Sequence, residues 1–455
     1  MTAACPHCGQ MTVLCEDTNF SQPAEMLSAG ELKAAFAEAI PRSRISILYQ
    51  LALFLVAIFM ILLPIVYVGF VASAIYGVYW YAVHAKTALF SGFAGGAHIF
   101  LFKLVAYFGP LFGGSVAIFF MLKPLFARSP KQPEALVLNP AIEPKLFQFI
   151  AHLSDLLSAP MPKRIDLNCE LNASASFRRG WLSFFGNDLV LTIGLPLVAG
   201  MDIRQFAAVV AHEFGHFTQG TAMRLGYIIH RINRWFMRVV YERDSWDETL
   251  EEWSNSAEDS RLTIVLACAH IAVWFSRQVL KLLMLCGHAV SCLLSRQMEF
   301  HADSCAINVS GSEKFESMQI CLREQAILHS LAYQSFQQFW EKKHQVPDNI
   351  PEYLIKLEKQ MPANFHEQAR NTLLNETAGL WATHPTAAQR IQKSRRQEAP
   401  GIFRLELPAT ILFSNFIGTS RTVTYIHYCE SLQLPITPNM VKPVRDFLKD
   451  AAAET

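Results

Sequence analysis

The chain has 455 residues, of which 52% are apolar and 17% are charged, and its net charge is +1. Because a soluble domain carries about 25% charged residues, part of this chain is expected to lie in lipid. The balanced charge gives no basis for the cationic face that nucleic-acid binders display, so we expect no nucleic-acid partner.

Residues 1–43 form a polar segment with no basic region followed by an apolar one, so no cleavable signal peptide is predicted. The segment contains CPHC at residues 5–8, which has the spacing of a metal knuckle. A structural zinc needs four ligands, and only His7 and Cys15 lie nearby. We therefore favour a cytosolic segment with free thiols over a second zinc site. The ten cysteines follow no framework spacing, which favours a reducing compartment.

Residues 44–123 are predicted to form a transmembrane hairpin. No Asp, Glu, Lys or Arg occurs from Ile45 to Val83, and a second apolar run extends from Leu104 to Leu122. A helix needs about 20 apolar residues to cross a bilayer. The first run is ample for one span and nearly enough for two, with Pro64 as a candidate break.

Cations outside the two runs set the expected orientation. Arg42 and Arg44 precede the first run, and Lys123, Arg128 and Lys131 follow the second. We expect two spans with both ends in the cytoplasm, in a bacterial inner membrane. If the first run formed two spans, the catalytic part would face outwards instead.

Beyond the hairpin the composition becomes that of a globular domain. Residues 124–140 contain four prolines and are predicted to be a linker. A mainly α domain with a small β-sheet is expected over 141–395, followed by a helical extension over 396–455. Residues 163–177 and 186–198 are strand candidates, and the second leads into a helix.

Two helical stretches raise the question of further membrane contact. Residues 262–294 are apolar but interrupted by Arg277 and Lys281, which favours partly buried or interfacial helices over full spans. Residues 221–243 carry five arginines among aromatic and aliphatic residues. They fit either a helix on an anionic membrane face or an ordinary amphipathic surface helix.

The pattern His-Glu-x-x-His occurs at residues 212–216, after an apolar helical stretch. Residues four apart lie on one face of a helix, so His212 and His216 can bind one ion. Glu213 then lies beside the ion, where it can accept a proton from water. Zinc suits this chemistry, and a catalytic zinc takes three protein ligands.

A second helical stretch, SRQMEFHAD, supplies candidates for the remaining roles. Glu299 could complete a His-His-Glu site, and Asp303, four residues later, could hold a ligand imidazole by its ring N–H. The alternative for these two carboxylates is a solvated helix face.

Three motifs in order, AHEFGHFTQG, SRQMEFHAD and THPTAAQRI, resemble the gluzincin family of the HtpX heat-shock protease and the CAAX prenyl protease. The resemblance covers roughly residues 120–395 and implies a zincin-like peptidase domain with one catalytic zinc ion. It implies that His212, His216 and Glu299 are the ligands, that Glu213 is catalytic, and that Asp303 supports the site.

The resemblance also extends to residues outside the metal site. It implies that His384 and Arg390 of the third motif lie near the cleft, as candidates for stabilising the oxyanion. LNASASF resembles the strand that lines the substrate groove, which makes Asn172, Ala173 and Ser174 substrate-binding candidates. An exposed edge strand can add a peptide by main-chain hydrogen bonds, whereas an ordinary strand of the sheet is the alternative.

Two departures from the family pattern are visible: the CPHC segment, and Phe300 where the family often has tyrosine. The expected function is nevertheless a membrane-anchored zinc endopeptidase that cleaves protein or peptide substrates in membrane protein quality control. A site-2-type intramembrane protease is one alternative, although Arg204, Gln205 and Gln219 flank the motif. A non-catalytic zinc scaffold is another, although it would have no use for Glu213.

Overall fold

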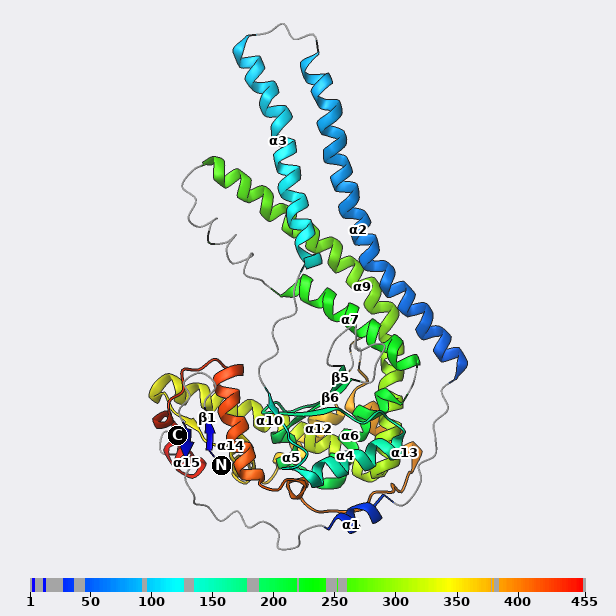
Figure 1. The fold of residues 1–455 in the computed structure, drawn as a ribbon, viewed down its shortest axis with the longest axis vertical. Helices are drawn as coiled ribbons and strands as arrows, with labels where there is room; N and C mark the ends of the chain where they lie inside the picture. The colour runs from blue at the N-terminus through cyan, green and yellow to red at the C-terminus, as the bar shows by residue number, and fades with distance from the viewer. Residues whose placement is uncertain are drawn as a thin grey trace. The chain divides into compact units, whose positions relative to one another are not determined.

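The computed structural model describes residues 2–4, 11–13, 28–36, 46–91, 96–126, 135–177, 188–218, 221–242, 252, 260–377, 379 and 384–452. The CPHC segment lies outside the described residues. The chain divides into two compact units (Figure 1). The first unit comprises Met1–Ile45, Gln132–Met223 and Arg296–Thr455, and the second comprises Ser46–Lys131 and Arg224–Ser295.

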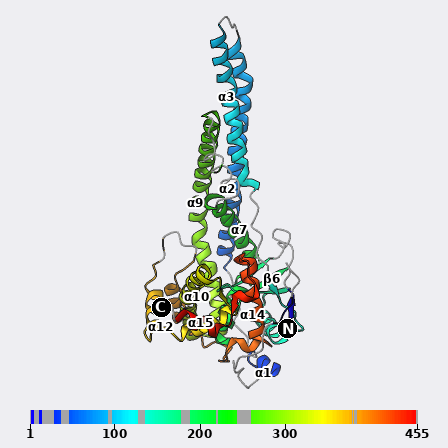
Figure 2. The ribbon, with the colours of Figure 1, turned by 90° about the vertical axis from the view of Figure 1, so that its left-hand side faces the viewer.

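The second unit contains two apolar helices, α2 (Ile47–Phe90) and α3 (Ala97–Leu122), that run side by side (Figures 1 and 2). Helix α2 continues through Pro64, so the first apolar run is one helix and not two. Polar groups between the helices find partners within the unit. The Tyr67 hydroxyl donates to the Met121 carbonyl (2.8 Å), and the Tyr81 hydroxyl donates to the Ala106 carbonyl (2.6 Å).

Three helices of the described chain are long and apolar enough to cross a membrane, which suggests a membrane protein: Ile47–Phe90, Ala97–Phe126 and His270–Ser310. The described chain therefore has three candidates where two spans were expected. The third candidate belongs to α9 (Ser260–Ser310), in the stretch where Arg277 and Lys281 led us to expect partly buried or interfacial helices. A helix of 51 residues can hold both cations and still contain an apolar stretch of span length.

A four-stranded sheet forms one layer of the first unit, in the order β3 (Leu136–Val137), β4 (Arg164–Asn168), β6 (Leu189–Gly194) and β5 (Ala173–Phe177). Strand β6 pairs parallel to β4 and antiparallel to β5, and β3 pairs antiparallel to β4. The strands predicted within 163–177 and 186–198 are confirmed. Strand β3 lies within the stretch that was expected to be a linker, and β5 lies at an edge of the sheet.

Helices pack against this sheet around one apolar core. The main ones are α4 (Pro144–Leu157), α6 (Ile203–Phe217) and α10 (Ser312–Lys343), and the end of α9 joins them. The other described elements of the unit are β1 (Thr2–Ala4), β2 (Met11–Val13), α1 (Ala29–Ala34), α5 (Leu195–Ala199), β7 (Val346–Pro347), α11 (Ile350–Glu358), α12 (Phe365–Leu374), α13 (Ala387–Gln397), η3 (Ala409–Leu412), α14 (Phe416–Ile426), η4 (His427–Ser431), η5 (Pro438–Met440), β8 (Val441–Lys442) and α15 (Val444–Ala452).

The segment after residue 395, which we expected to be a helical extension, packs into the same core. Phe403, Tyr428 and Phe447 are buried in the cluster that also holds Phe206 of α6. The segment also satisfies the start of α6, because the backbone N–H of Ile203 donates to the carbonyl of Leu407 (2.7 Å). A helix start leaves N–H groups without intrahelical partners, so this bond stabilises α6.

Candidate metal centre

Helix α6 carries the His-Glu-x-x-His pattern near its C-terminal end. Its start is fixed by a capping box, in which Asp202 accepts from the Gln205 N–H while the Gln205 side chain accepts from the Asp202 N–H. The helix buries an apolar face that includes Phe206 and Phe214. This burial fixes its rotation, which turns His212 and His216 toward α9.

Glycine at position 215 permits the close crossing of α6 and α9. A β-carbon there would lie 2.8 Å from the α-carbon of Ala302, so a larger residue would push the helices apart. Our sequence reasoning missed this role, because Gly215 occupies a position that the motif leaves open. The crossing places Glu299 and Asp303 of α9 opposite the two histidines of α6.

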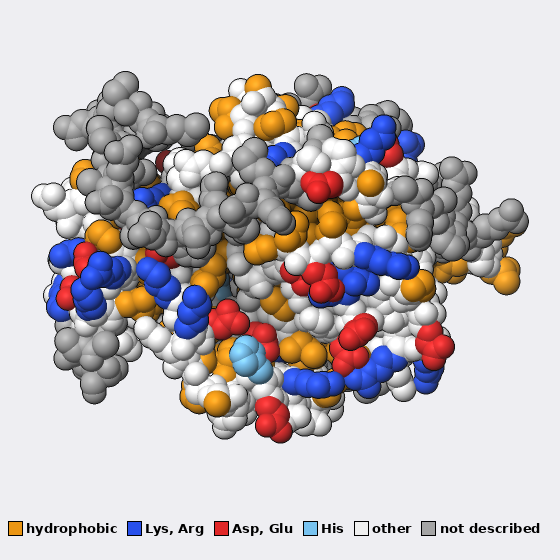
Figure 3. Space-filling view, turned by 90° about the horizontal axis from the view of Figure 1, so that it is seen from below, with side chains coloured by type: hydrophobic (Ala, Val, Ile, Leu, Met, Phe, Trp, Pro, Cys, Tyr) orange, Lys and Arg blue, Asp and Glu red, His pale blue; other side chains and the backbone are white. Residues whose placement is uncertain are grey.

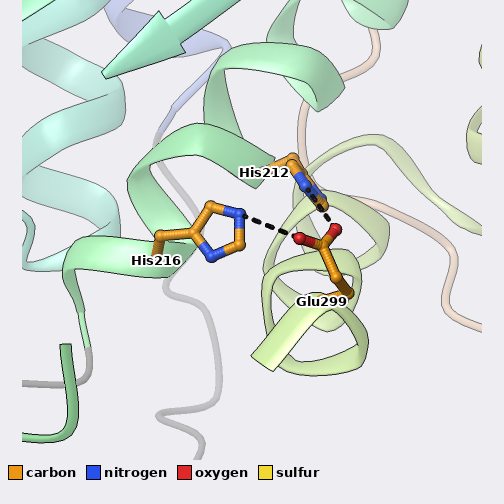
Figure 4. Close-up of side chains that lie close together, drawn as sticks. All are labelled: His212, His216 and Glu299. Carbon is orange, nitrogen blue, oxygen red and sulfur yellow. Dashed lines mark ion pairs between the residues drawn. The ribbon is translucent and has the colours of Figure 1, made fainter. Parts of the chain in front are cut away.

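The three predicted metal ligands converge (Figure 4). Nε2 of His212 lies 3.4 Å from Oε2 of Glu299, and Nε2 of His216 lies 3.9 Å from Oε1 of the same carboxylate. One donor atom from each of the three residues lies within 4.8 Å of the other two. Zinc bound tetrahedrally to nitrogen and oxygen at its usual bond lengths separates its ligand atoms by about 3.3 Å. The two histidines and Glu299 therefore fit such an ion after small side-chain movements.

The electrostatics of the group favour a cation at the same place. Burial disfavours the charged form of His212, but hydrogen bonds with Asp303 and Glu299 outweigh it and raise the pKa of His212 to about 9. Of the two carboxylates, Glu299 faces Nε2 of His212 and so supplies negative charge on the side where a metal ion would bind.

Asp303 supports His212 from behind, in the position expected from the sequence. Its Oδ1 lies 3.1 Å from Nδ1 of His212, and the Asp303 side chain is fully buried. With Nε2 directed toward Glu299, Nδ1 carries the hydrogen and donates to Asp303. Such a bond fixes both the tautomer and the ring orientation of a metal ligand.

Arg390 of α13 neutralises this buried aspartate. Its Nε donates to both carboxylate oxygens of Asp303 (3.1 and 3.0 Å), and its Nη2 donates to Oδ1 (2.5 Å). The guanidinium is therefore engaged with Asp303, 3.3 Å from His212 Nδ1. This arrangement differs from the expected oxyanion role and suits a residue that positions Asp303.

Glu213 lies beside the ligands rather than among them. Its Oε2 accepts a hydrogen bond from the backbone N–H of Ala175 in β5 (3.2 Å). Desolvation raises the pKa of Glu213, against opposing contributions from His212 and Ala175. A carboxylate with a raised pKa is a stronger base, as general-base catalysis requires. The contact with Ala175 was not foreseen, because it joins a strand to a helix.

The backbone groups of β5 divide into those that bond to β6 and those that face away from it. The N–H of Gly194 in β6 donates to the carbonyl of Asn172 (2.8 Å), and Ser174 and Ser176 are paired with Thr192 and Val190. Backbone groups alternate in direction along a strand, so those of the odd-numbered residues face away from β6. The bond from Ala175 to Glu213 agrees with this. Of the three predicted groove residues, Ala173 therefore has backbone groups that face away from β6, although the residue is only 5% exposed, whereas Asn172 and Ser174 bond to the sheet.

His384 also reaches the metal centre. Its Nδ1 lies 3.1 Å from Oε1 of Glu299, and its side chain is 68% exposed. A hydrogen bond to Glu299 is the main cause that raises the pKa of His384. Phe300, the departure from the family pattern, lies beneath the ammonium group of Lys393, 5.0 Å from its ring centre.

A second group of donor atoms is present at the surface of the first unit. Glu324, Glu358 and His366 bring ligand atoms within 4.8 Å of one another. An ion pair between His366 and Glu324 (2.9 Å) accounts for this group. On the face shown in Figure 3, acidic and basic side chains of the described residues lie interspersed.

The fold and the site together are those of a metallopeptidase: a histidine pair on one helix, a glutamate on a second helix, and another glutamate that contacts the edge of a sheet. Residues 140–398 match the model of peptidase family M48, and the chain belongs to this family. The match covers three strands of the sheet (β4, β5 and β6) together with α6, α9, α10 and α13, and so all the residues of the centre. A comparison with curated proteins finds no match.

Proposed function

We propose that this metallopeptidase is a membrane-anchored zinc endopeptidase that hydrolyses internal peptide bonds of protein substrates, with its peptidase unit in the cytoplasm. The observation that carries the proposal is the convergence of His212, His216 and Glu299 beside Glu213. Zinc would be held by these three ligands and, when bound, would polarise the scissile carbonyl and activate water.

Glu213 acts as the general base. Its carboxylate takes a proton from the water whose oxygen attacks the carbonyl carbon, and it returns that proton to the leaving amine as the C–N bond breaks. The hydrogen bond from Ala175 orients this carboxylate, and desolvation keeps it basic. Asp303 and Arg390 act indirectly: Asp303 fixes the orientation of His212, and Arg390 holds Asp303.

The edge of β5 is the proposed substrate groove. A peptide that pairs with this edge would bond to the backbone groups of Ala173 and Phe177 that face away from β6, and it would pass beside Ala175 and Glu213. Because the strand continues on both sides of Ala175, the groove can hold substrate on both sides of the cleaved bond. This arrangement favours an endopeptidase that recognises backbone more than side chains. His384, exposed beside Glu299, is the remaining candidate for the oxyanion.

The decisive experiment replaces Glu213 by glutamine. Glutamine keeps the size and can accept the hydrogen bond from Ala175, but it cannot take a proton. Hydrolysis of an unfolded substrate such as casein should fall by about 10²–10⁴-fold while zinc content and substrate binding persist. Glu324→Gln is the matched control and should cleave at the parent rate. Equal cleavage by the Glu213→Gln variant would refute the mechanism, and an inactive parent would favour a zinc scaffold.

The groove is tested separately by Ala173→Pro, which removes an N–H on the open edge without removing a bond to β6. KM for casein should rise while zinc content is unchanged. Ser174→Ala keeps every backbone group and should leave KM unaltered. If Ser174→Ala raises KM and Ala173→Pro does not, side chains rather than the open edge bind the substrate.

A site-2-type intramembrane protease would need its metal helix within the bilayer. Helix α6 has 15 residues, roughly 22 Å, which is shorter than a hydrocarbon core of about 30 Å. It is also not one of the three helices of the described chain that qualify as spans. Glu299 lies in the third of these, His270–Ser310, but in the part from Arg296 onward that belongs to the peptidase unit. That helix has 41 residues, about twice the length that one span needs. These lengths favour a centre outside the lipid.

The proposed orientation rests on the basic flanks of the hairpin. A reporter that is active only in the cytoplasm, fused after residue 130, should be active. Activity of an exported reporter at the same point would place the peptidase unit in the other compartment. A role in membrane protein quality control predicts that membrane proteins accumulate in cells that carry Glu213→Gln in place of the parent protein.

A further inference from the structure

Helix α7 (Thr221–Tyr241) belongs to the second unit from Arg224 onward, together with the apolar helices. One face of α7 is buried and includes Ile229, Ile232 and Phe236. It is tied to α9 by a hydrogen bond from the Asn233 side chain to the hydroxyl of Ser291 (3.0 Å). The helix is therefore part of the membrane-associated unit and not a free surface element.

The opposite face of α7 carries a cationic stripe, which we define as Arg224, Arg231, Arg234 and Arg238. Their spacing of seven, three and four residues puts them on one side of a helix with 3.6 residues per turn. The sequence of α7 contains no Asp or Glu. Arg234 is exposed, and the other three are partly exposed.

Aromatic and apolar side chains accompany the stripe. The Arg231 guanidinium donates to the hydroxyl of Tyr227 (2.9 Å) and lies 5.7 Å from its ring centre. Tyr241 and Met237 are 57% and 49% exposed. At the C-terminal end the Glu242 carboxylate lies 4.0 Å from Nε of Arg238, and Arg277 of α9 donates to the Glu242 carbonyl (3.4 Å), which adds another cation there.

These features fit one environment. A row of arginines is costly against hydrocarbon, so a helix of this kind in a membrane-associated unit is stable at the lipid–water boundary. There arginine meets phosphate, and exposed tyrosine and methionine meet the outer part of the acyl chains. Bidentate contacts with phosphate favour arginine over lysine, and the stripe contains no lysine.

We propose that α7 is an interfacial helix whose cationic stripe binds the headgroups of anionic phospholipids. This lipid site lies outside the peptidase centre and does not depend on the proposed hydrolysis. Each arginine near an anionic surface contributes about a five-fold gain in binding, so three substitutions should remove most of the preference for anionic lipid.

The experiment compares the full-length protein in nanodiscs of phosphatidylcholine alone and of phosphatidylcholine mixed with phosphatidylglycerol. The midpoint of thermal unfolding of the parent should rise with phosphatidylglycerol. The Arg231→Gln, Arg234→Gln, Arg238→Gln variant should lose that rise and unfold like the parent in phosphatidylcholine. A second readout counts the phosphatidylglycerol molecules that stay bound per chain after detergent exchange.

Two control variants distinguish the charge of the cationic stripe from a general loss of arginine. Lysine at the same three positions keeps the charge and should keep most of the rise. Arg370→Gln with Arg395→Gln removes two exposed arginines of the first unit and should keep all of it. If the triple glutamine variant does not fold, Arg234→Gln alone should reduce the count of bound lipid. An equal midpoint of the parent in both lipids, or an unchanged lipid count in the glutamine variants, would overturn the proposal. Inorganic phosphate reproducing the full rise would also overturn it.

Discussion

The backbone of Ala302 in α9 lies against Gly215 of α6 so closely that no β-carbon fits at position 215. This contact sets the distance between the helix that carries the histidines and the helix that carries Glu299. The residue between Glu213 and His216 that seems chemically inert therefore controls whether three ligands meet.

Gly215→Ala should separate the two helices and cost about 1–3 kcal/mol of stability, as overpacking typically does. The separation should also weaken zinc binding, because Glu299 moves with α9. Competition with a chelator measures the affinity, and thermal unfolding measures the stability. Gly77→Ala in α2 is the control, since nothing lies within 4 Å of its added carbon. Unchanged zinc affinity in Gly215→Ala would contradict the role of the crossing.

Removal of any one ligand should abolish tight zinc binding. His212→Ala or Glu299→Ala leaves two donors, which is too few for a stable catalytic site. Metal analysis of the purified chain should find one zinc in the parent and almost none in either variant. Glu324→Ala and His366→Ala should keep the full content. A Cys5→Ser, Cys8→Ser background removes any contribution of the CPHC segment, and undiminished zinc in both ligand variants would refute the assignment.

Arg390→Lys should weaken zinc binding by about 10–100-fold, because lysine cannot hold both oxygens of Asp303 and the orientation of His212 is lost. Competition with a chelator measures the zinc affinity of the variant and of the parent. Arg395→Lys in the same helix is the matched control, since Arg395 pairs with Glu316 at the surface. Equal effects of the two substitutions would show that Arg390 has only a structural role.

His427 makes the first unit sensitive to acid. It is buried, its Nε2 lies 2.7 Å from the Tyr333 hydroxyl, and desolvation with a contribution from His329 lowers its pKa to about 4. An unfolded histidine titrates near 6.5, so between these values the unfolded chain binds more protons and stability falls as pH falls. The loss amounts to about 2 kcal/mol at pH 5 and is absent above pH 7.

The measurement is thermal unfolding at pH 7.5 and pH 5 for the parent and for His427→Gln. Glutamine can accept the hydrogen bond from Tyr333 but does not titrate, so the variant should lose less stability on acidification. An identical drop in both proteins would assign the acid sensitivity to other groups.

The sequence was sufficient to predict those features that residue type and spacing along the chain determine. The histidines four apart, and Glu299 four residues before Asp303, occupy helix faces that any α-helix would give them. The strands before α6 were also predictable, because β4 alternates polar and apolar residues and β6 is a short, mainly apolar run. These features depend on neighbours along the chain.

Other features depend on contacts between distant segments, and they escaped prediction. Ala175 meets Glu213 only because β5 is the edge strand, and Arg390 meets Asp303 only because α13 packs on α9. The third candidate span was discounted because two cations in α9 were weighed without the length of the helix. Local sequence does not contain this information.

The core that surrounds α6 is completed by Phe403, Tyr428 and Phe447, close to the C-terminal end of the sequence. During synthesis the apolar hairpin leaves the ribosome well before these residues exist. The order of synthesis therefore delays assembly of the peptidase unit until its anchor has been made. A nascent chain that still lacks Phe403, Tyr428 and Phe447 has no complete core around α6, so the packing that orients the two histidines is completed only after the apolar hairpin has been made.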